Sequence, residues 1–78
     1  MNNTRRKQIA KAIALIEEAR AIIESAGEEE REAFENLPES IQETEKGEQM
    51  ETNADTLDEI NDELGDFIDE MTEMQRRK

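Results

Sequence analysis

The stretch FENLPESIQETEKGEQME, residues 34–51, contains the only proline in this chain of 78 residues. A residue that precedes proline avoids the α-helical region, so a helix should end near Asn36, just before Leu37. Pro38 suits the first position of a new helical turn, and Glu39 in that turn interacts favourably with the helix dipole. The stretch therefore predicts one helical turn, PESIQ, between two longer elements.

Thr44 is a favourable N-cap for the element that follows, with Glu45 and Glu48 in its first turn, although Gly47 weakens the start of a helix. The linker is short, and short connections join antiparallel neighbours in helical proteins. The chain is therefore expected to be an all-α antiparallel helical hairpin. Its predicted parts are a first helix at about residues 4–36, a linker at 37–44 and a second helix at about 45–76, within one domain spanning 1–78.

The first helix carries apolar residues at helical spacing. With Ile9 at heptad position a, alanine occupies position d four times, and position g adds Leu15 and Ile22. The apolar stripe in the first half of this helix is therefore wider than the seam between two helices requires. The surplus predicts a homodimer that forms a four-helix bundle or coiled coil, or else a different protein partner. The residues expected at that surface are Ile9, Ile13, Leu15, Ile16, Ile22 and Ile23.

The second helix has its own seven-residue series, formed by Met50, Leu57, Leu64 and Met71. A second apolar series is expected to complete its seam, formed by Ile60, Phe67 and Met74. Ala54 and Ile68 are expected on the flank of this seam, and Asn61 falls beside it, where an asparagine can fix the register of two helices. The methionines are interpreted as flexible core residues rather than as a ligand-binding surface.

Two local features of the first helix and linker need an interpretation. Ser25 and Glu28 have the spacing of a capping box, but the apolar register continues in phase beyond them, so the helix is expected to be continuous or slightly kinked.

The linker end gathers several apolar residues that either close the end of the hairpin as a plug or form a recognition loop. These residues are Phe34, Leu37, Ile41 and Met50.

Composition excludes several classes of function. The chain has 22 acidic and 10 basic residues, a net charge of −12, no cysteine and no histidine. Direct binding of DNA or RNA phosphates to the acidic body is unfavourable. Disulfides and thiolate metal sites are excluded, and the serines lack the histidine that would activate them as nucleophiles. We therefore expect no enzymatic activity and no cofactor.

Basic residues gather at both ends of the chain. Residues 1–11 carry a net charge of +4 and residues 76–78 carry +3, whereas residues 12–75 carry −19. An antiparallel hairpin brings both basic segments to one tip, opposite the linker. The N-terminal segment has no signal-peptide cleavage site, and no run approaches about 20 apolar residues, so neither secretion nor a membrane span is expected. Residues 1–16 could lie on a membrane surface, but we favour a helix that faces a protein.

Paired carboxylates raise one enzymatic alternative. Glu28, Glu29 and Glu32 match E-E-x-x-E, and Glu59 with Asp62 matches a later E-x-x-D. This arrangement resembles the magnesium site of all-α nucleotide pyrophosphatases. Such spacings arise easily by chance among 22 acidic residues, and in the heptad frame these glutamates do not converge inward. A solvated acidic face is the preferred interpretation, without a metal.

The acidic face of the second helix allows a further function. Regularly spaced carboxylates can imitate DNA phosphates and occupy the basic groove of a nucleic-acid-binding protein. An inhibitor of a host nucleic-acid-binding or defence protein, of the anti-restriction or anti-CRISPR type, is therefore the alternative to a face that only maintains solubility. The residues of this face are Asp55, Asp58, Asp62, Asp66 and Asp69.

The run FENLPESIQETEKGEQMETNADTLDEI, residues 34–60, resembles small, uncharacterised bacteriophage and prophage proteins with the pattern F-x-N-L/M-P-E-S-x-Q-x-S/T-E-K/R-G-E-x-M-E. The resemblance covers residues 31–64, and Asn61 and Gly65 depart from the regular apolar spacing of that group. It carries no known activity. It implies a bacterial or phage protein of the host cytoplasm. The partners expected from the apolar stripe and the acidic face are a second copy of the chain and a host or phage protein with a basic surface, not nucleic acid or a membrane.

Overall fold

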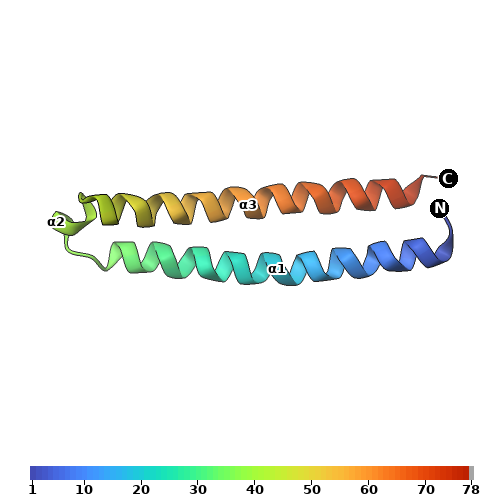
Figure 1. Ribbon diagram of the computed structural model, residues 1–78, viewed down its shortest axis with the longest axis horizontal. Helices are drawn as coiled ribbons and strands as arrows, with labels where there is room; N and C mark the ends of the chain where they lie inside the picture. Colours follow the sequence, from blue (N-terminus) through green and yellow to red (C-terminus); the bar gives the residue numbers. More distant parts are fainter. Residues whose placement is uncertain (78) are drawn as a thin grey trace.

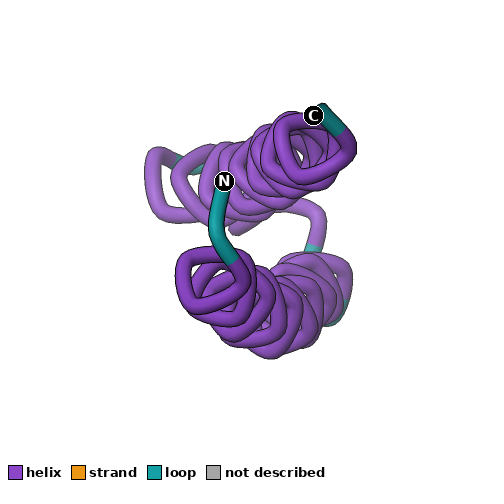
Figure 2. The backbone as a smooth tube through the Cα atoms, turned by 90° about the vertical axis from the view of Figure 1, so that its right-hand side faces the viewer, coloured by secondary structure: helices purple, strands orange, loops and turns teal. Residues whose placement is uncertain are grey.

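The computed structural model describes residues 1–77 and consists of two long helices joined by a short one (Figure 1). Helix α1 spans Asn3–Glu35, α2 spans Glu39–Gln42 and α3 spans Glu45–Arg76. Figures 1 and 2 show α1 and α3 side by side and antiparallel, with both termini at the end opposite α2. The predicted all-α antiparallel hairpin with a helical turn in its linker is confirmed. It forms a rod whose backbone measures 58 × 16 × 12 Å.

Helix α1 runs without interruption through Ser25 and Gly27, so the capping box in that region is not used as a helix start. The helix begins at a different cap, where the Asn2 side chain accepts a hydrogen bond from the Arg5 backbone N–H at 2.9 Å. It ends at Asn36, whose N–H donates to the Glu32 carbonyl at 3.0 Å. Within residues 1–77, no helix combines the length and the hydrophobicity needed to cross a lipid bilayer.

The linker is held by hydrogen bonds from a residue that sequence reasoning did not single out. The Gln42 side-chain amide donates to the carbonyl of Leu37, just after α1, at 2.9 Å and to that of Phe34, in the last turn of α1, at 3.3 Å. Pro38 is the N-cap of α2 rather than its first residue. The predicted cap of α3 is present, since the Thr44 hydroxyl accepts from the Gly47 N–H at 3.5 Å.

Gly47 is required by close packing, because α2 lies directly against the first turn of α3. A methyl group built on Gly47 would overlap the backbone of Gln42, with the Gln42 Cα atom only 2.7 Å away. Gly47 itself has an ordinary helical conformation. The glycine therefore lets the linker fold back onto α3.

The seam between α1 and α3 uses only one of the two columns that heptad spacing suggested for α3, the half-buried Met50, Leu57, Leu64 and Met71. Ala54 and Ile68, expected on the flank, are buried with 1% and 8% of their surface exposed. Ile60 and Phe67, expected in the seam, expose 40% and 51%. Helix α1 shows the same offset, since Gly27 is buried while the neighbouring Ala26 is exposed. Positions d and e flank position a on opposite sides of a helix, so spacing by sevens does not decide which column faces inward.

A polar contact crosses the seam between these same inward columns of α1 and α3. Arg20 of α1 donates from Nε to Asn61 Oδ1 of α3 at 2.9 Å, and both residues are partly buried. The Arg20 guanidinium lies over Gly65, where an added Cβ atom would come within 3.0 Å of it. A partly buried Arg needs such a partner and such space, because an unpaired buried charge is costly. Asn61 thus holds the register, and Gly65 makes room for the cation.

Candidate interaction surface

Besides Met1 at the N-terminus and Ile41 in α2, four large apolar side chains along the two long helices face solvent. Leu15 and Ile22 of α1 expose 57% and 70% of their surface, and Ile60 and Phe67 of α3 are exposed as described above. Such residues scattered singly are common on protein surfaces, whereas a contiguous patch marks an interaction site. The relative positions of the four side chains therefore decide whether they form such a patch.

All four side chains lie on the same flank of the hairpin. The opposite flank is identified by Arg31 of α1, which pairs with Asp58 of α3 at 3.0 Å. At 100° per residue, Ile22 and Arg31 lie on opposite sides of the inward-facing Ile23. Asp58 and Ile60 lie on opposite sides of the inward-facing Leu57 in the same way. Because Arg31 and Asp58 meet on one flank, the exposed apolar residues share the other.

The four side chains also lie at matching heights along the rod. Arg20 is level with Asn61, and Gln75 donates to the Arg6 carbonyl at 3.1 Å, so residues of α1 and α3 face each other when their numbers sum to about 81–82. Leu15 is therefore level with Phe67, and Ile22 is level with Ile60. We call this set the apolar face: Leu15, Ile22, Ile60 and Phe67, bordered on α1 by Ala12 and Ala19.

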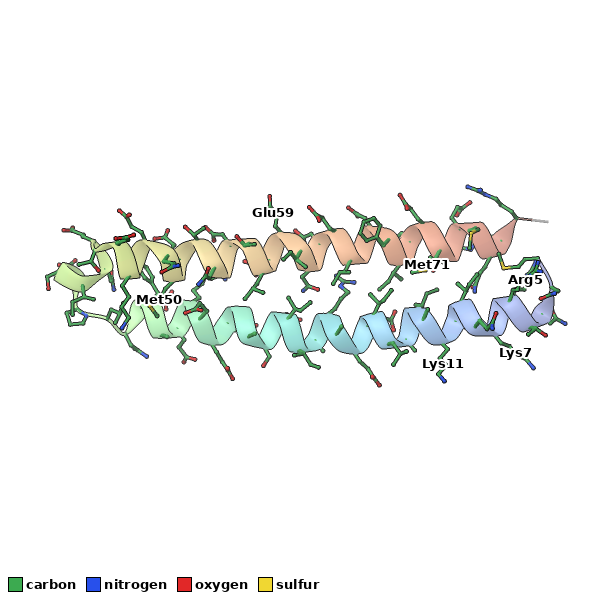
Figure 3. All side chains as sticks on the ribbon, viewed as in Figure 1. Arg5, Lys7, Lys11, Met50, Glu59 and Met71 are labelled. Carbon is green, nitrogen blue, oxygen red and sulfur yellow. The ribbon has the colours of Figure 1, made fainter. Side chains whose placement is uncertain are left out.

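The predicted association surface is only partly the apolar face. Leu15 and Ile22 belong to it, whereas Ile9, Ile13, Ile16 and Ile23 are half-buried along the hairpin's own seam. Figure 3 shows the labelled Met50 and Met71 between the two helices, on the α3 side of that seam. Ile60 and Phe67 were missed as surface residues because they were assigned to the seam. The extra width of the α1 stripe was the signal that found the other half of the face.

The linker residues converge at the closed end of the rod. Phe34, Leu37 and Met50 are half-buried there, whereas Ile41 exposes 39% of its surface. A pocket of about 180 Å³ opens beside Phe34 and Ala54. Its other lining side chains are charged: Arg31, Glu35, Glu51 and Asp55. Three of the four residues are thus partly shielded from solvent, while Ile41 stays accessible.

The predicted acidic face lies on the flank opposite the apolar face. Its five aspartates, Asp55, Asp58, Asp62, Asp66 and Asp69, are all exposed. Arg31 bridges two of them, at 3.1 Å from Asp55 and 3.0 Å from Asp58. The hydrogen bond and charge of Asp58, with a smaller contribution from Asp55, raise the pKa of the Arg31 guanidinium, so this cation stays charged. The face is therefore partly neutralised at its linker end.

The carboxylates of the magnesium-site alternative are not brought together. Glu59 points away from α1 (Figure 3) and is level with residues 22–23, not with Glu28, Glu29 or Glu32. Among residues 1–77, no three acidic side chains converge in an arrangement that could hold a metal ion.

The two basic segments meet at the terminal end of the rod. Figure 3 places Arg5, Lys7 and Lys11 toward that end of α1, where α3 also finishes. Arg76 lies 3.8 Å from Glu73 of its own helix. Lys78, predicted to join this cluster, is outside the described residues.

The similarity of residues 31–64 to phage and prophage proteins stays a prediction. No protein-family model, curated protein or solved structure matches this chain.

Proposed function

We propose that this chain is a non-enzymatic, acidic helical protein of phage or prophage origin that acts through protein–protein interaction in the cytoplasm of a bacterial host. Its first partner is another copy of itself. The observation that carries the proposal is the apolar face, in which two helices contribute level pairs of exposed side chains on one flank. A heterologous protein with a complementary apolar groove is the alternative occupant.

Replacing Ile22 by Glu should dissociate the self-associated protein. The change places a charge in the apolar face, and a dimer contains it twice. A loss of about 2 kcal/mol per site, typical of an interface hot spot, weakens a dimer roughly a thousandfold. Light scattering during size-exclusion chromatography measures the mass, and circular dichroism checks that the helices persist.

Ala21→Glu is the matched control. Ala21 is exposed and adjacent to Ile22, but it points to the flank opposite the apolar face. It should keep the mass of the unmodified protein. An equal loss of mass in both variants, or no loss in Ile22→Glu, would contradict the assignment of the face.

The acidic face supports a second candidate function, a nucleic-acid mimic that binds a basic host protein. Its aspartates run from Asp55 to Asp69, about 21 Å along the helix at 1.5 Å per residue, and all are exposed. Because this flank lies opposite the apolar face, self-association leaves it open to a partner.

Reversal of charge at Asp62, Asp66 and Asp69 to Lys tests the mimic. We expect the immobilised protein to retain basic host proteins that duplex DNA displaces and that added salt releases, and the triple variant should lose them. The control changes Glu39, Glu43 and Glu48 to Lys, which alters net charge equally at the linker. If both triple variants lose the basic host proteins equally, retention depends on net charge and not on the acidic face, and the mimic is ruled out.

A further inference from the structure

We infer that the apolar face is occupied by a second copy of the chain in antiparallel orientation, so that the terminal end of one hairpin lies against the linker end of the other. The inference rests on the proposed self-association and adds its geometry. Closed dimers of identical chains use a two-fold axis, and two hairpins stacked face to face have two such arrangements. In one the rods are parallel, and in the other they are antiparallel.

The apolar side chains fit both arrangements. A two-fold axis through the centre of the face, perpendicular to the rod, brings Leu15 of one copy to Ile22 of the second and Ile60 to Phe67 of the second. An axis along the rod instead brings Leu15 to the second copy's Phe67. Burial of the four side chains therefore does not choose between the orientations, and the choice depends on the charges around them.

Charge is divided unequally about the centre of the apolar face. The terminal half, residues 1–18 and 64–78, has seven basic and six acidic side chains, a net charge of +1. The linker half, residues 19–63, has three basic and sixteen acidic side chains, a net charge of −13. Parallel stacking sets the two linker halves against each other, where like charges repel. Antiparallel stacking sets each linker half against a terminal half and removes most of that repulsion.

Individual residues follow the same division. Arg5 lies seven residues before Ala12 and so continues the border of the apolar face, and the antiparallel axis makes it level with Glu32 of the second copy. Glu29, seven residues after Ile22, continues the face toward the linker and comes within about one turn of the second copy's Lys11. In the parallel arrangement Arg5 would instead meet the basic C-terminal segment of the second copy.

The exposed area of the chain is sufficient for such an interface. The hairpin has a solvent-accessible surface of 6110 Å², whereas a compact monomer of 9.0 kDa exposes about 4,900 Å². The excess of about 1,200 Å² is larger than the roughly 800 Å² that each partner contributes to a standard stable interface. Two stacked hairpins thus recover the burial that one rod lacks.

Electron spin labels on single introduced cysteines test the orientation, because the chain has no cysteine of its own. Thr4→Cys places a label near the terminal end and Ser40→Cys places one in the linker, both at exposed positions. Thr4 lies about 14 residues from the centre of the apolar face, so the two labels of an antiparallel dimer are about 45 Å apart. The Ser40 labels should be more than about 50 Å apart.

Pulsed dipolar spectroscopy gives these distances directly. Distances of about 45 Å and above 50 Å support the antiparallel dimer. Distances within about 25 Å for both variants indicate a parallel dimer, since neighbouring helices pack 8–10 Å apart, and overturn the inference while self-association stands. No dipolar coupling between molecules at concentrations where the unmodified chain would be dimeric overturns both.

Charge exchange gives a second readout with opposite signs for the two orientations. Arg5→Glu should weaken an antiparallel dimer about fivefold to tenfold, and adding Glu32→Arg should restore it. Lys7→Glu is the control, because it changes net charge equally on the flank away from the face. A dimer strengthened by Arg5→Glu would indicate the parallel arrangement and contradict the inference.

Discussion

Ile68→Ala should lower the free energy of unfolding of the hairpin by about 2–4 kcal/mol. Ile68 exposes only 8% of its surface and belongs to the small set of residues buried between α1 and α3. Removing its side chain leaves a cavity in a seam that has little other buried apolar surface. Since domains of this size are marginally stable, the loss should be visible as a large fall in helicity at moderate urea concentration.

Ile60→Ala is the matched control, the same change eight residues earlier on the same helix. Ile60 exposes 40% of its surface, so its truncation should cost the monomeric hairpin less than about 1 kcal/mol. Urea unfolding followed by circular dichroism, at concentrations low enough to keep the chain monomeric, compares the two. A larger loss for Ile60→Ala than for Ile68→Ala would mean that the d column, not the e column, faces the partner helix.

The second large effect is expected at the linker. Gly47→Ala should lower stability by about 2 kcal/mol, because the added methyl group overlaps the Gln42 backbone and the cost of overpacking exceeds the gain in helix propensity. For a domain of this size the change corresponds to a melting temperature lower by about 8–15 °C.

Gly27→Ala is expected to act in the opposite direction. A Cβ atom at Gly27 would meet its nearest neighbours, Leu57 Cβ and Asp58 Oδ1, at 3.6 Å, which is ordinary contact. The substitution should therefore add about 1 kcal/mol through helix propensity and raise the melting temperature by about 4–8 °C. Thermal unfolding of the Gly47→Ala and Gly27→Ala variants tests both expectations. If both substitutions raised the melting temperature, Gly47 would not be needed for close packing.

Sequence periodicity was sufficient to predict the hairpin, because Pro38 and Thr44 separate two long apolar repeats. It was not sufficient to predict the inward column. Positions d and e are equally compatible with a seven-residue repeat, and in α3 the larger residues, Ile60 and Phe67, favoured the wrong one. The inward e column carries a contact between Arg20 and Asn61, 41 positions apart, and no local pattern contains such a contact.

The candidate site was partly predictable for the same reason. The surplus width of the α1 stripe identified Leu15 and Ile22 as exposed apolar residues before the packing was known. Their partners on α3, Ile60 and Phe67, are recognised only when the seam is assigned correctly. The d column of α3 belongs to the apolar face because it is not buried in the seam. The linker shows a similar limit, since the roles of Gln42 and Gly47 depend on how closely α2 approaches α3.

The two proposed surfaces are compatible in one molecule. Antiparallel stacking through the apolar face leaves the aspartates of each α3 on the outside of a four-helix assembly. Such an assembly would present two acidic faces related by the two-fold axis. A basic partner could then be engaged twice, which would increase the apparent affinity without new contacts.

Sedimentation equilibrium of the unmodified chain tests the central claim most directly. The chain has a mass of 9.0 kDa, and a dimer held by the apolar face has twice that mass, about 18 kDa. We expect the weight-average mass to approach the dimer value as the protein concentration rises through the micromolar range, with circular dichroism reporting full helicity. A fully helical chain that stays at 9.0 kDa up to about 100 μM would contradict self-association through this face.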